Sequence, residues 1–98
     1  MPRSLWFSET AIKQINEEYL RGIDDGIVAV AAKEELIREL AKLAADPPTQ
    51  GHAGGPFETR PTHAFTLKCA GRRRAMVSYR IDDTKNQLQV LLFTSLPT

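Results

Sequence analysis

The sequence predicts an α+β fold in the order β-α-α-β-β-β, in which a mainly antiparallel four-stranded sheet carries a helical hairpin on one face. Two observations predict this fold. Residues 9–45 contain two stretches with apolar residues at three- and four-residue steps, which is typical of amphipathic helices. Residues 62–95 contain runs in which apolar and polar residues alternate, as they do in half-buried strands. With 98 residues, the chain is expected to form one domain over residues 1–98.

The first strand and the first helix follow from a short apolar run and a capping residue. The run SLWFS (Ser4–Ser8) predicts a short strand, and Ser8 is suited to cap the helix that follows it. Glu9 lies at the positive end of that helix, which we expect from about Glu9 to Arg21. The apolar stripe of this helix is predicted to consist of Ile12, Ile15, Tyr19 and Ile23.

The second helix is expected to begin at about Ile27 and to end at about Ala45, with Asp24 or Asp25 as its cap. The short connection between the two helices predicts an antiparallel hairpin. The positions predicted to face the core are Ile27, Val30, Ala31, Ile37, Leu40, Leu43 and Ala44, and Leu36 lies beside this set. The ion pairs expected on the solvent face are Glu34–Arg38 and Glu35–Arg38.

Three strands are expected after a proline- and glycine-rich loop, Asp46–Pro61. In HAFTLKCA (His63–Ala70), the residues predicted to face the core are Phe65, Leu67 and Cys69. In RRAMVSYRID (Arg73–Asp82), Ala75, Val77, Tyr79 and Ile81 alternate with Arg74, Met76, Ser78 and Arg80. LQVLLFTS (Leu88–Ser95) is apolar on both faces, which predicts a central strand, and Asn86 suits the turn before it.

The charge is unevenly distributed along the chain, although the net charge is only +1. Residues 1–50 carry six Lys/Arg and nine Asp/Glu, whereas residues 51–98 carry seven and three. The segment Arg60–Arg80 contains six basic residues and no acidic residue. Such asymmetry is typical of a surface that binds a polyanion, and ordinary surface charge is the alternative.

Other features of the composition narrow the class of protein. The single cysteine excludes an internal disulfide and fits a reducing compartment. No run approaches the ~18 apolar residues of a membrane span, and the N-terminus lacks the apolar core of a signal peptide. We therefore expect a cytoplasmic protein without membrane contact. His52, His63 and Cys69 do not have metal-ligand spacing, so neither a metal nor another cofactor is expected.

The order of elements and several local patterns resemble the RelE/ParE superfamily of bacterial toxins. The resemblance covers nearly the whole chain and rests on the combined order of these patterns. From the N-terminus they are WFSETA (Trp6–Ala11), Leu43 followed by Pro47, Pro48 and Gly51, the pair Leu67-Lys68, VSYRID (Val77–Asp82), and the apolar strand Leu88–Phe93.

This resemblance implies the toxin of a type II toxin–antitoxin pair, a kind of pair associated with plasmid stabilisation. RelE-like toxins enter the ribosomal A site and cut mRNA, whereas ParE-like toxins share the fold, lack the nuclease residues and poison DNA gyrase. Both are held inactive by an antitoxin whose extended segment wraps the toxin. The expected partner is therefore an antitoxin, and the basic face of this chain is a physical reason to expect an acidic, partly disordered one.

Cleavage of RNA without a metal needs an activated 2′-OH, a stabilised phosphate charge and a protonated leaving oxygen, which histidine, lysine and arginine can provide. The candidate catalytic residues are Lys68, Arg72, Arg73, Arg74 and His63. The candidate nucleic-acid-binding residues are Arg60, Lys68, Arg72, Arg73, Arg74 and Arg80. For each of them a structural or solvated role is the alternative; for Arg80 it is a pairing with Asp82 or Asp83.

This chain departs from the nuclease pattern in two places. Met76 stands where many nuclease members carry an arginine, three residues before Tyr79. The stretch FTSLPT at the end of the sequence has neither the basic or histidine residues nor the tyrosine-bearing helix that often follow the last strand. Three interpretations stay open: a RelE-like mRNA endoribonuclease, a ParE-like gyrase poison, and a family member that binds RNA or protein without toxicity.

Overall fold

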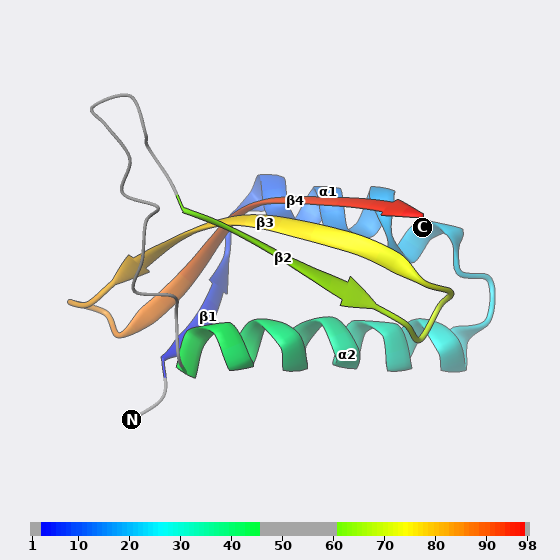
Figure 1. Ribbon diagram of the computed structural model, residues 1–98, viewed down its shortest axis with the longest axis horizontal. Coiled ribbons are helices and arrows are strands. Elements are labelled where there is room, and N and C mark those ends of the chain that lie inside the picture. The colour runs from blue at the N-terminus through cyan, green and yellow to red at the C-terminus, as the bar shows by residue number, and fades with distance from the viewer. Residues whose placement is uncertain (1–2, 46–60, 98) are drawn as a thin grey trace.

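The computed structural model describes residues 3–45 and 61–97. Its elements confirm the predicted order, with a short 3-10 helix, η1, between the two α-helices (Figure 1). Within these residues, no helix is both long enough and apolar enough to span a membrane. The elements are β1 (Ser4–Phe7), α1 (Glu9–Glu18), η1 (Leu20–Gly22), α2 (Gly26–Ala45), β2 (Thr62–Leu67), β3 (Arg73–Asp82) and β4 (Gln87–Pro97).

The four strands form one sheet in the order β1-β4-β3-β2. β3 pairs antiparallel with β2 and with β4, whereas β1 pairs parallel with β4, so the sheet is mixed and mainly antiparallel. The long β4 lies between two neighbours, which confirms that it is a central strand. Asn86 has φ 53° in the turn between β3 and β4, which confirms the left-handed conformation expected of it.

Both α-helices begin at the predicted capping residues. The N–H of Ala11 donates to the Ser8 hydroxyl at 3.0 Å, and that hydroxyl donates in turn to the carbonyl of Leu91 in β4 at 2.8 Å. At the start of α2, the N–H groups of Ile27 and Val28 donate to the Asp25 carboxylate at 2.8 and 3.3 Å. Ser8 therefore both starts α1 and ties it to the sheet.

The core lies between one face of the sheet and both helices. The core-facing residues of β3 and β4 are almost completely buried: Ala75, Val77 and Tyr79 in one strand, Leu88, Val90 and Phe93 in the other. α1 packs against β4, and α2 packs against β1 and β2. We call the opposite face, which neither helix covers, the open face of the sheet. It carries the outward-pointing residues of β3 and β4.

The helices differ from the prediction in length and in the residues that they bury. α1 ends at Glu18, because Tyr19 leaves helical geometry (φ −126°, ψ −60°), and η1 follows it. Ile12, predicted in the core, is exposed. In α2 the predictions for Ile27, Val30 and Ile37 were wrong, with exposed fractions of 83%, 59% and 41%. The residues of α2 that are buried are Ala32, Leu36, Leu40, Leu43 and Ala44.

The errors at Ile12 and Ile37 have one physical cause, because both residues line the space between the two helices. The two helices contact different parts of the sheet, so the facing sides of α1 and α2 are not sealed against each other. Only the stripe of α2 that faces β1 and β2 is covered. The core assignment of Cys69 was wrong for a different reason: β2 ends at Leu67, so its alternation does not continue, and Cys69 is exposed in the turn that follows.

Candidate nucleic-acid interface

The turn between β2 and β3 carries basic residues at both of its ends. Leu67 and Arg73 are the last paired residues of the two strands, and Lys68 and Arg72 follow them on either side. We call Lys68–Arg72 the basic turn. Gly71 has φ +84° there, in the left-handed region that favours glycine. Lys68 and Arg72 are both exposed, so the turn presents two positive charges to solvent.

Glu35, from the middle of α2, holds the backbone of the basic turn. Its carboxylate accepts from the N–H of Lys68 at 2.9 and 3.0 Å and from the N–H of Cys69 at 3.0 Å. The sequence does not indicate this role, and it predicts a pair of Glu35 with Arg38. Among residues 3–45 and 61–97, the ion pairs join Arg3 to Asp83 and Lys42 to Glu39 instead.

The same carboxylate affects the thiol beside it. Desolvation, and after it the charge and the hydrogen bond of Glu35, raise the pKa of Cys69. A raised pKa keeps the thiol protonated at neutral pH, and a protonated thiol is a poor nucleophile. Cys69 is therefore not an activated group of this surface, although it is exposed.

Arg74 lies on the open face, two residues after the basic turn. It is opposite Thr66 in β2 and Leu96 in β4. Strand alternation places it there, because the next residue, Ala75, is fully buried. Its side chain is exposed and makes no hydrogen bond or ion pair with the part of the chain that the structure describes. An arginine in this state can meet a phosphate without breaking an internal contact.

Arg73 points to the other face of the sheet. Its Nη2 donates to the carbonyl of Glu18 at 3.1 Å and to the hydroxyl of Ser95 at 3.3 Å. The Ser95 hydroxyl donates to the same carbonyl at 3.1 Å. Glu18 is the last residue of α1, so the guanidinium lies at the negative end of a helix. This geometry argues for a structural role, in contrast to the phosphate contact expected from the sequence.

Arg80 lies far from the basic turn along β3. It lies six positions after Arg74, which corresponds to about 20 Å in a strand. Its guanidinium donates to the side-chain carbonyl of Gln89, at 2.9 Å from Nε. The expected pairing with Asp82 or Asp83 is not what the structure has: Gln89 lies between Arg80 and Asp82, and Asp83 pairs with Arg3.

The structure does not bring His63 together with Arg74. His63 is paired with the buried Val77 and stacks on Phe65 with ring centroids 5.8 Å apart, so it belongs to the core-facing side of β2. His52 and Arg60 lie outside the described residues. Among the residues that are described, no group of three His, Cys, Asp or Glu could hold a metal ion.

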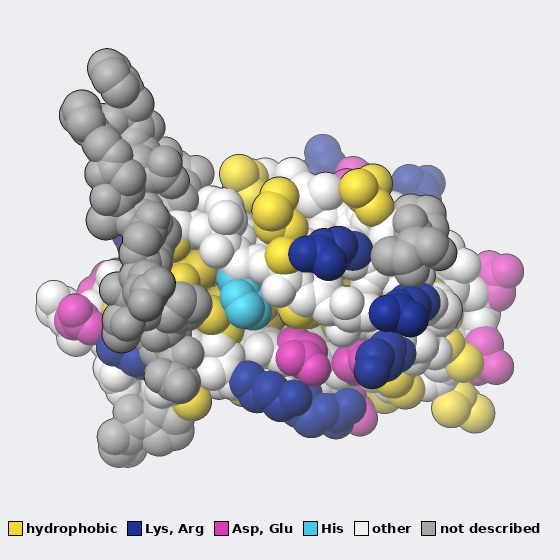
Figure 2. All heavy atoms as spheres, in the orientation of Figure 1, with side chains coloured by type: hydrophobic (Ala, Val, Ile, Leu, Met, Phe, Trp, Pro, Cys, Tyr) yellow, Lys and Arg dark blue, Asp and Glu magenta, His cyan; other side chains and the backbone are white. Residues whose placement is uncertain are grey.

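The open face also carries hydrophobic side chains beside the basic ones. Met76, Leu92 and Leu96 have exposed fractions of 48%, 39% and 64%. They lie on neighbouring strands, because Leu96 is opposite Arg74 and Leu92 is opposite Ser78. Figure 2 shows Lys and Arg side chains in dark blue close to hydrophobic side chains in yellow on the face that it presents. The surface can therefore make both phosphate contacts and apolar contacts.

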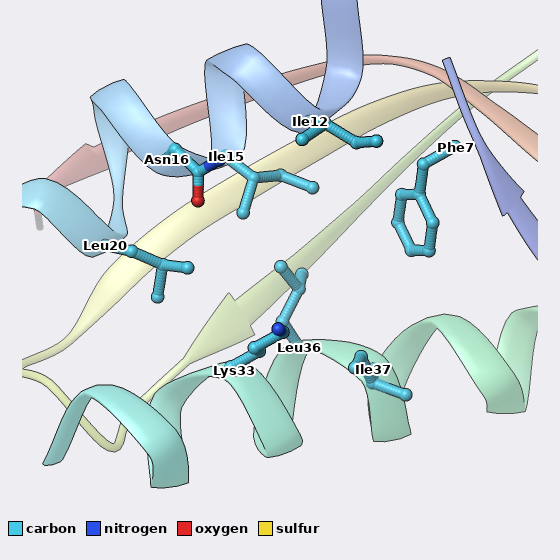
Figure 3. A pocket seen from close by; sticks show the side chains of 8 residues that line it. All are labelled: Phe7, Ile12, Ile15, Asn16, Leu20, Lys33, Leu36 and Ile37. Carbon is cyan, nitrogen blue, oxygen red and sulfur yellow. The ribbon is translucent and has the colours of Figure 1, made fainter. Parts of the chain in front are cut away.

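A second feature lies on the opposite side of the sheet. An apolar cleft of about 250 Å³ opens between α1 and α2. Figure 3 shows Phe7 and Ile15 reaching from β1 and α1 into this space, with Leu36 of α2 pointing toward them. The sequence does not indicate this cleft, because the periodicity of both helices predicts their exposed apolar residues in the core. Its lining residues are Phe7, Ile12, Ile15, Asn16, Leu20, Lys33, Leu36 and Ile37.

Comparison with known proteins gives matches only at the level of structure. No protein-family model matches the sequence, and no curated protein sequence matches it either. A double arginine-to-alanine mutant of the Escherichia coli toxin RelE in the free state is 21% identical, with a TM-score of 0.53 over 96% of this chain and 83% of that one. The chain therefore has the fold of the RelE toxins.

Two further structures agree with this result. In the intact E. coli RelBE toxin–antitoxin complex, the matching chain is 18% identical, with a TM-score of 0.52 over 98% of this chain and 99% of that one. A metal-bound toxin from Helicobacter pylori is 16% identical, with a TM-score of 0.50 over 95% of this chain and 93% of that one. At these identities the likeness concerns the fold, and the site must be argued from its own geometry.

Proposed function

We propose that this single-domain chain is the toxin of a type II toxin–antitoxin pair, and that it acts in the cytoplasm by binding RNA through the basic turn and Arg74. The observation that carries the proposal is the position of Arg74. It is an exposed arginine without a partner among the described residues, on the open face of a RelE-like sheet and next to a turn with two more cations. The guanidinium fork suits phosphate oxygens, and the neighbouring charges strengthen the local attraction.

The more specific form of this proposal is metal-independent cleavage of mRNA. Attack of a 2′-OH on the adjacent phosphorus needs a group that takes the proton, cations that stabilise the phosphate charge and a donor for the leaving oxygen. Arg74 and Arg72 fit the second task. Lys68 is the amine of this surface that can take part in proton transfer. His63 lies on the core-facing side of β2, so the geometry supports RNA binding more strongly than cleavage.

Induction in a bacterial host tests the proposal. Expression of the wild type should stop growth, and the double change Lys68→Gln with Arg74→Gln should abolish toxicity while the melting temperature stays close to that of the wild type. Lys85→Gln is the control, since it removes an exposed charge in the turn that follows the other end of β3. Mapping of mRNA ends after induction then separates cleavage from binding alone. Full toxicity of the double variant would overturn the proposal.

A second candidate function is a protein-binding poison of the gyrase type. The observation in its favour is the exposed apolar group Met76, Leu92 and Leu96, because a protein partner could bury these side chains. It predicts growth arrest with intact mRNA, inhibition of DNA supercoiling, and loss of toxicity for Leu92→Asp but not for Arg74→Gln. If induction causes no growth defect, both toxin functions are excluded. A family member that binds RNA or protein without toxicity then remains.

The antitoxin partner is also a proposal. The E. coli RelBE structure is a toxin–antitoxin complex, and this chain has a similar fold. The cleft between α1 and α2 has the apolar lining that the hydrophobic side of a partner segment requires. A small acidic protein encoded next to this one should co-purify with it and suppress its toxicity. The change Ile37→Glu, at a half-exposed position of the lining, should weaken that complex, whereas Ile27→Glu, outside the lining, should not.

A further inference from the structure

We propose that Glu35 is a positioning residue for RNA binding: its carboxylate fixes the backbone of the basic turn so that the turn presents its cations in one arrangement. The inference rests on the proposed RNA-binding function and goes beyond it by assigning a role to an acidic residue on another element. The contacts are three hydrogen bonds of 2.9–3.0 Å from the N–H groups of Lys68 and Cys69.

Apart from the contacts with Glu35, the turn contains an isolated β-bridge between Cys69 and Gly71 and no strand pairing at Lys68. Lys68 and Cys69 are exposed, and β2 has already ended at Leu67, so the strand ladder does not hold these two amides. Hydrogen bonds from backbone N–H groups to a carboxylate are among the stronger ones in proteins. Glu35 thus replaces ladder pairing at the point where the chain leaves β2, and it does so from the rigid middle of a 20-residue helix.

The negative charge of Glu35 should weaken RNA binding, whereas its hydrogen bonds to the turn should strengthen it. A carboxylate beside the basic turn repels phosphate, so its removal should tighten RNA binding if electrostatics alone mattered. If Glu35 positions the turn, its removal should weaken RNA binding in spite of the lost repulsion. The sign of the change therefore separates the two roles.

Two substitutions separate charge from hydrogen bonding at the same position. Glu35→Ala removes the charge and both acceptor oxygens and keeps a residue that favours helix. Glu35→Gln removes the same charge and keeps one acceptor oxygen. Glu34→Ala is the matched control: Glu34 is the neighbouring exposed carboxylate on α2, and it makes no hydrogen bond or ion pair with the described part of the chain.

The experiment measures the affinity of each variant for a fluorescently labelled single-stranded RNA, together with amide hydrogen exchange of the turn. We expect Glu35→Ala to bind RNA about tenfold more weakly, as the loss of a charge-assisted hydrogen bond implies. Its Lys68 and Cys69 amides should exchange faster. Glu35→Gln should lie closer to the wild type, and Glu34→Ala should bind at least as tightly as the wild type.

Each other outcome counts against the inference. Tighter binding by Glu35→Ala would show that only its charge matters. Unchanged affinity with a lower melting temperature would show a purely structural role. If the wild type does not bind RNA, or if Lys68→Gln with Arg74→Gln binds as well as the wild type, the proposed function fails and the positioning role fails with it. If the wild type binds RNA through these cations and Glu35→Ala binds equally well, only the inference about Glu35 fails.

Discussion

The guanidinium of Arg73 lies 3.1 Å from the carbonyl oxygen of Glu18, the last residue of α1. This contact divides three consecutive arginines between the two faces of the sheet. Arg73 ties the end of a helix to β3 and, through Ser95, to β4. Arg74 points to the open face, and Arg72 lies in the basic turn between them and β2. The three side chains should therefore respond differently to the same substitution.

Arg73→Gln should destabilise the protein by about 1–2 kcal/mol, because hydrogen bonds from a charged group to Glu18 and Ser95 are lost. The expected value is modest because the Nε of Arg73 is buried without a partner among the described residues, which already costs stability. Urea denaturation measures the change. Arg74→Gln is the control and should shift the midpoint by little, since that side chain is exposed. Equal midpoints for the two variants would contradict the division of roles.

Arg74→Gln should instead change the salt dependence of RNA binding. Each phosphate contact to a single strand contributes about 0.7 to the slope of log affinity against log salt concentration. Loss of one contact should reduce the slope by about that amount. Arg80→Gln should leave it unchanged, because the Arg80 guanidinium is bonded to Gln89 and lies about 20 Å away along the strand. A smaller slope for the Arg80 variant would place it in the interface after all.

Because of Tyr19, the free energy of unfolding should depend on pH in the alkaline range. Desolvation, with a smaller effect from the charge of Glu35, raises its pKa to about 12, from 10.0 in the unfolded chain. Since the folded state then holds the proton more tightly, the contribution of Tyr19 to stability is constant below pH 10 and is lost as the pH rises toward 12. The loss should approach about 3 kcal/mol once the titration is complete, because each unit of pKa shift corresponds to ~1.4 kcal/mol.

Tyr19→Phe tests this dependence without a large change in packing. The Tyr19 hydroxyl is buried without a hydrogen-bond partner among the described residues, so its removal should cost little at neutral pH. Urea denaturation of both proteins at pH 8 and pH 11 gives the comparison. The Phe variant should lose less stability between these pH values than the wild type. Burial also raises the pKa of Tyr79, but that effect is common to both proteins and cancels.

Features that depend on neighbouring residues could be predicted from the sequence. Ser8 and Asp25 cap the helices, Asn86 adopts the left-handed turn conformation, and β4 is central, because each of these follows from the chemistry or periodicity of a short segment. The position of Arg73 could have been predicted in the same way. It has the same alternation as Ala75, so the core-facing side was readable from the pattern.

Features that depend on residues far apart in the sequence could not be predicted from it. The bond between Glu35 and the Lys68 amide joins residues 33 positions apart, and a glutamate amid charged residues of a helix carries no local sign of such a partner. The exposure of Ile27 could not be predicted from the sequence either. Periodicity shows which residues of a helix share a side, but the position of the sheet decides which side is covered.

The substitutions Leu36→Ala and Ile27→Ala test which side of α2 is covered by the sheet. Leu36 is almost completely buried at the base of the cleft between α1 and α2, and its truncation should destabilise the protein by about 2–5 kcal/mol through lost burial and the cavity left behind. Ile27 is 83% exposed, so the same kind of truncation should change stability by less than about 0.5 kcal/mol. Alanine favours helix at both positions, so propensity cannot produce the contrast. A large loss for Ile27→Ala would mean that the sequence-based core of α2 was right and that the helix is rotated relative to the structure described.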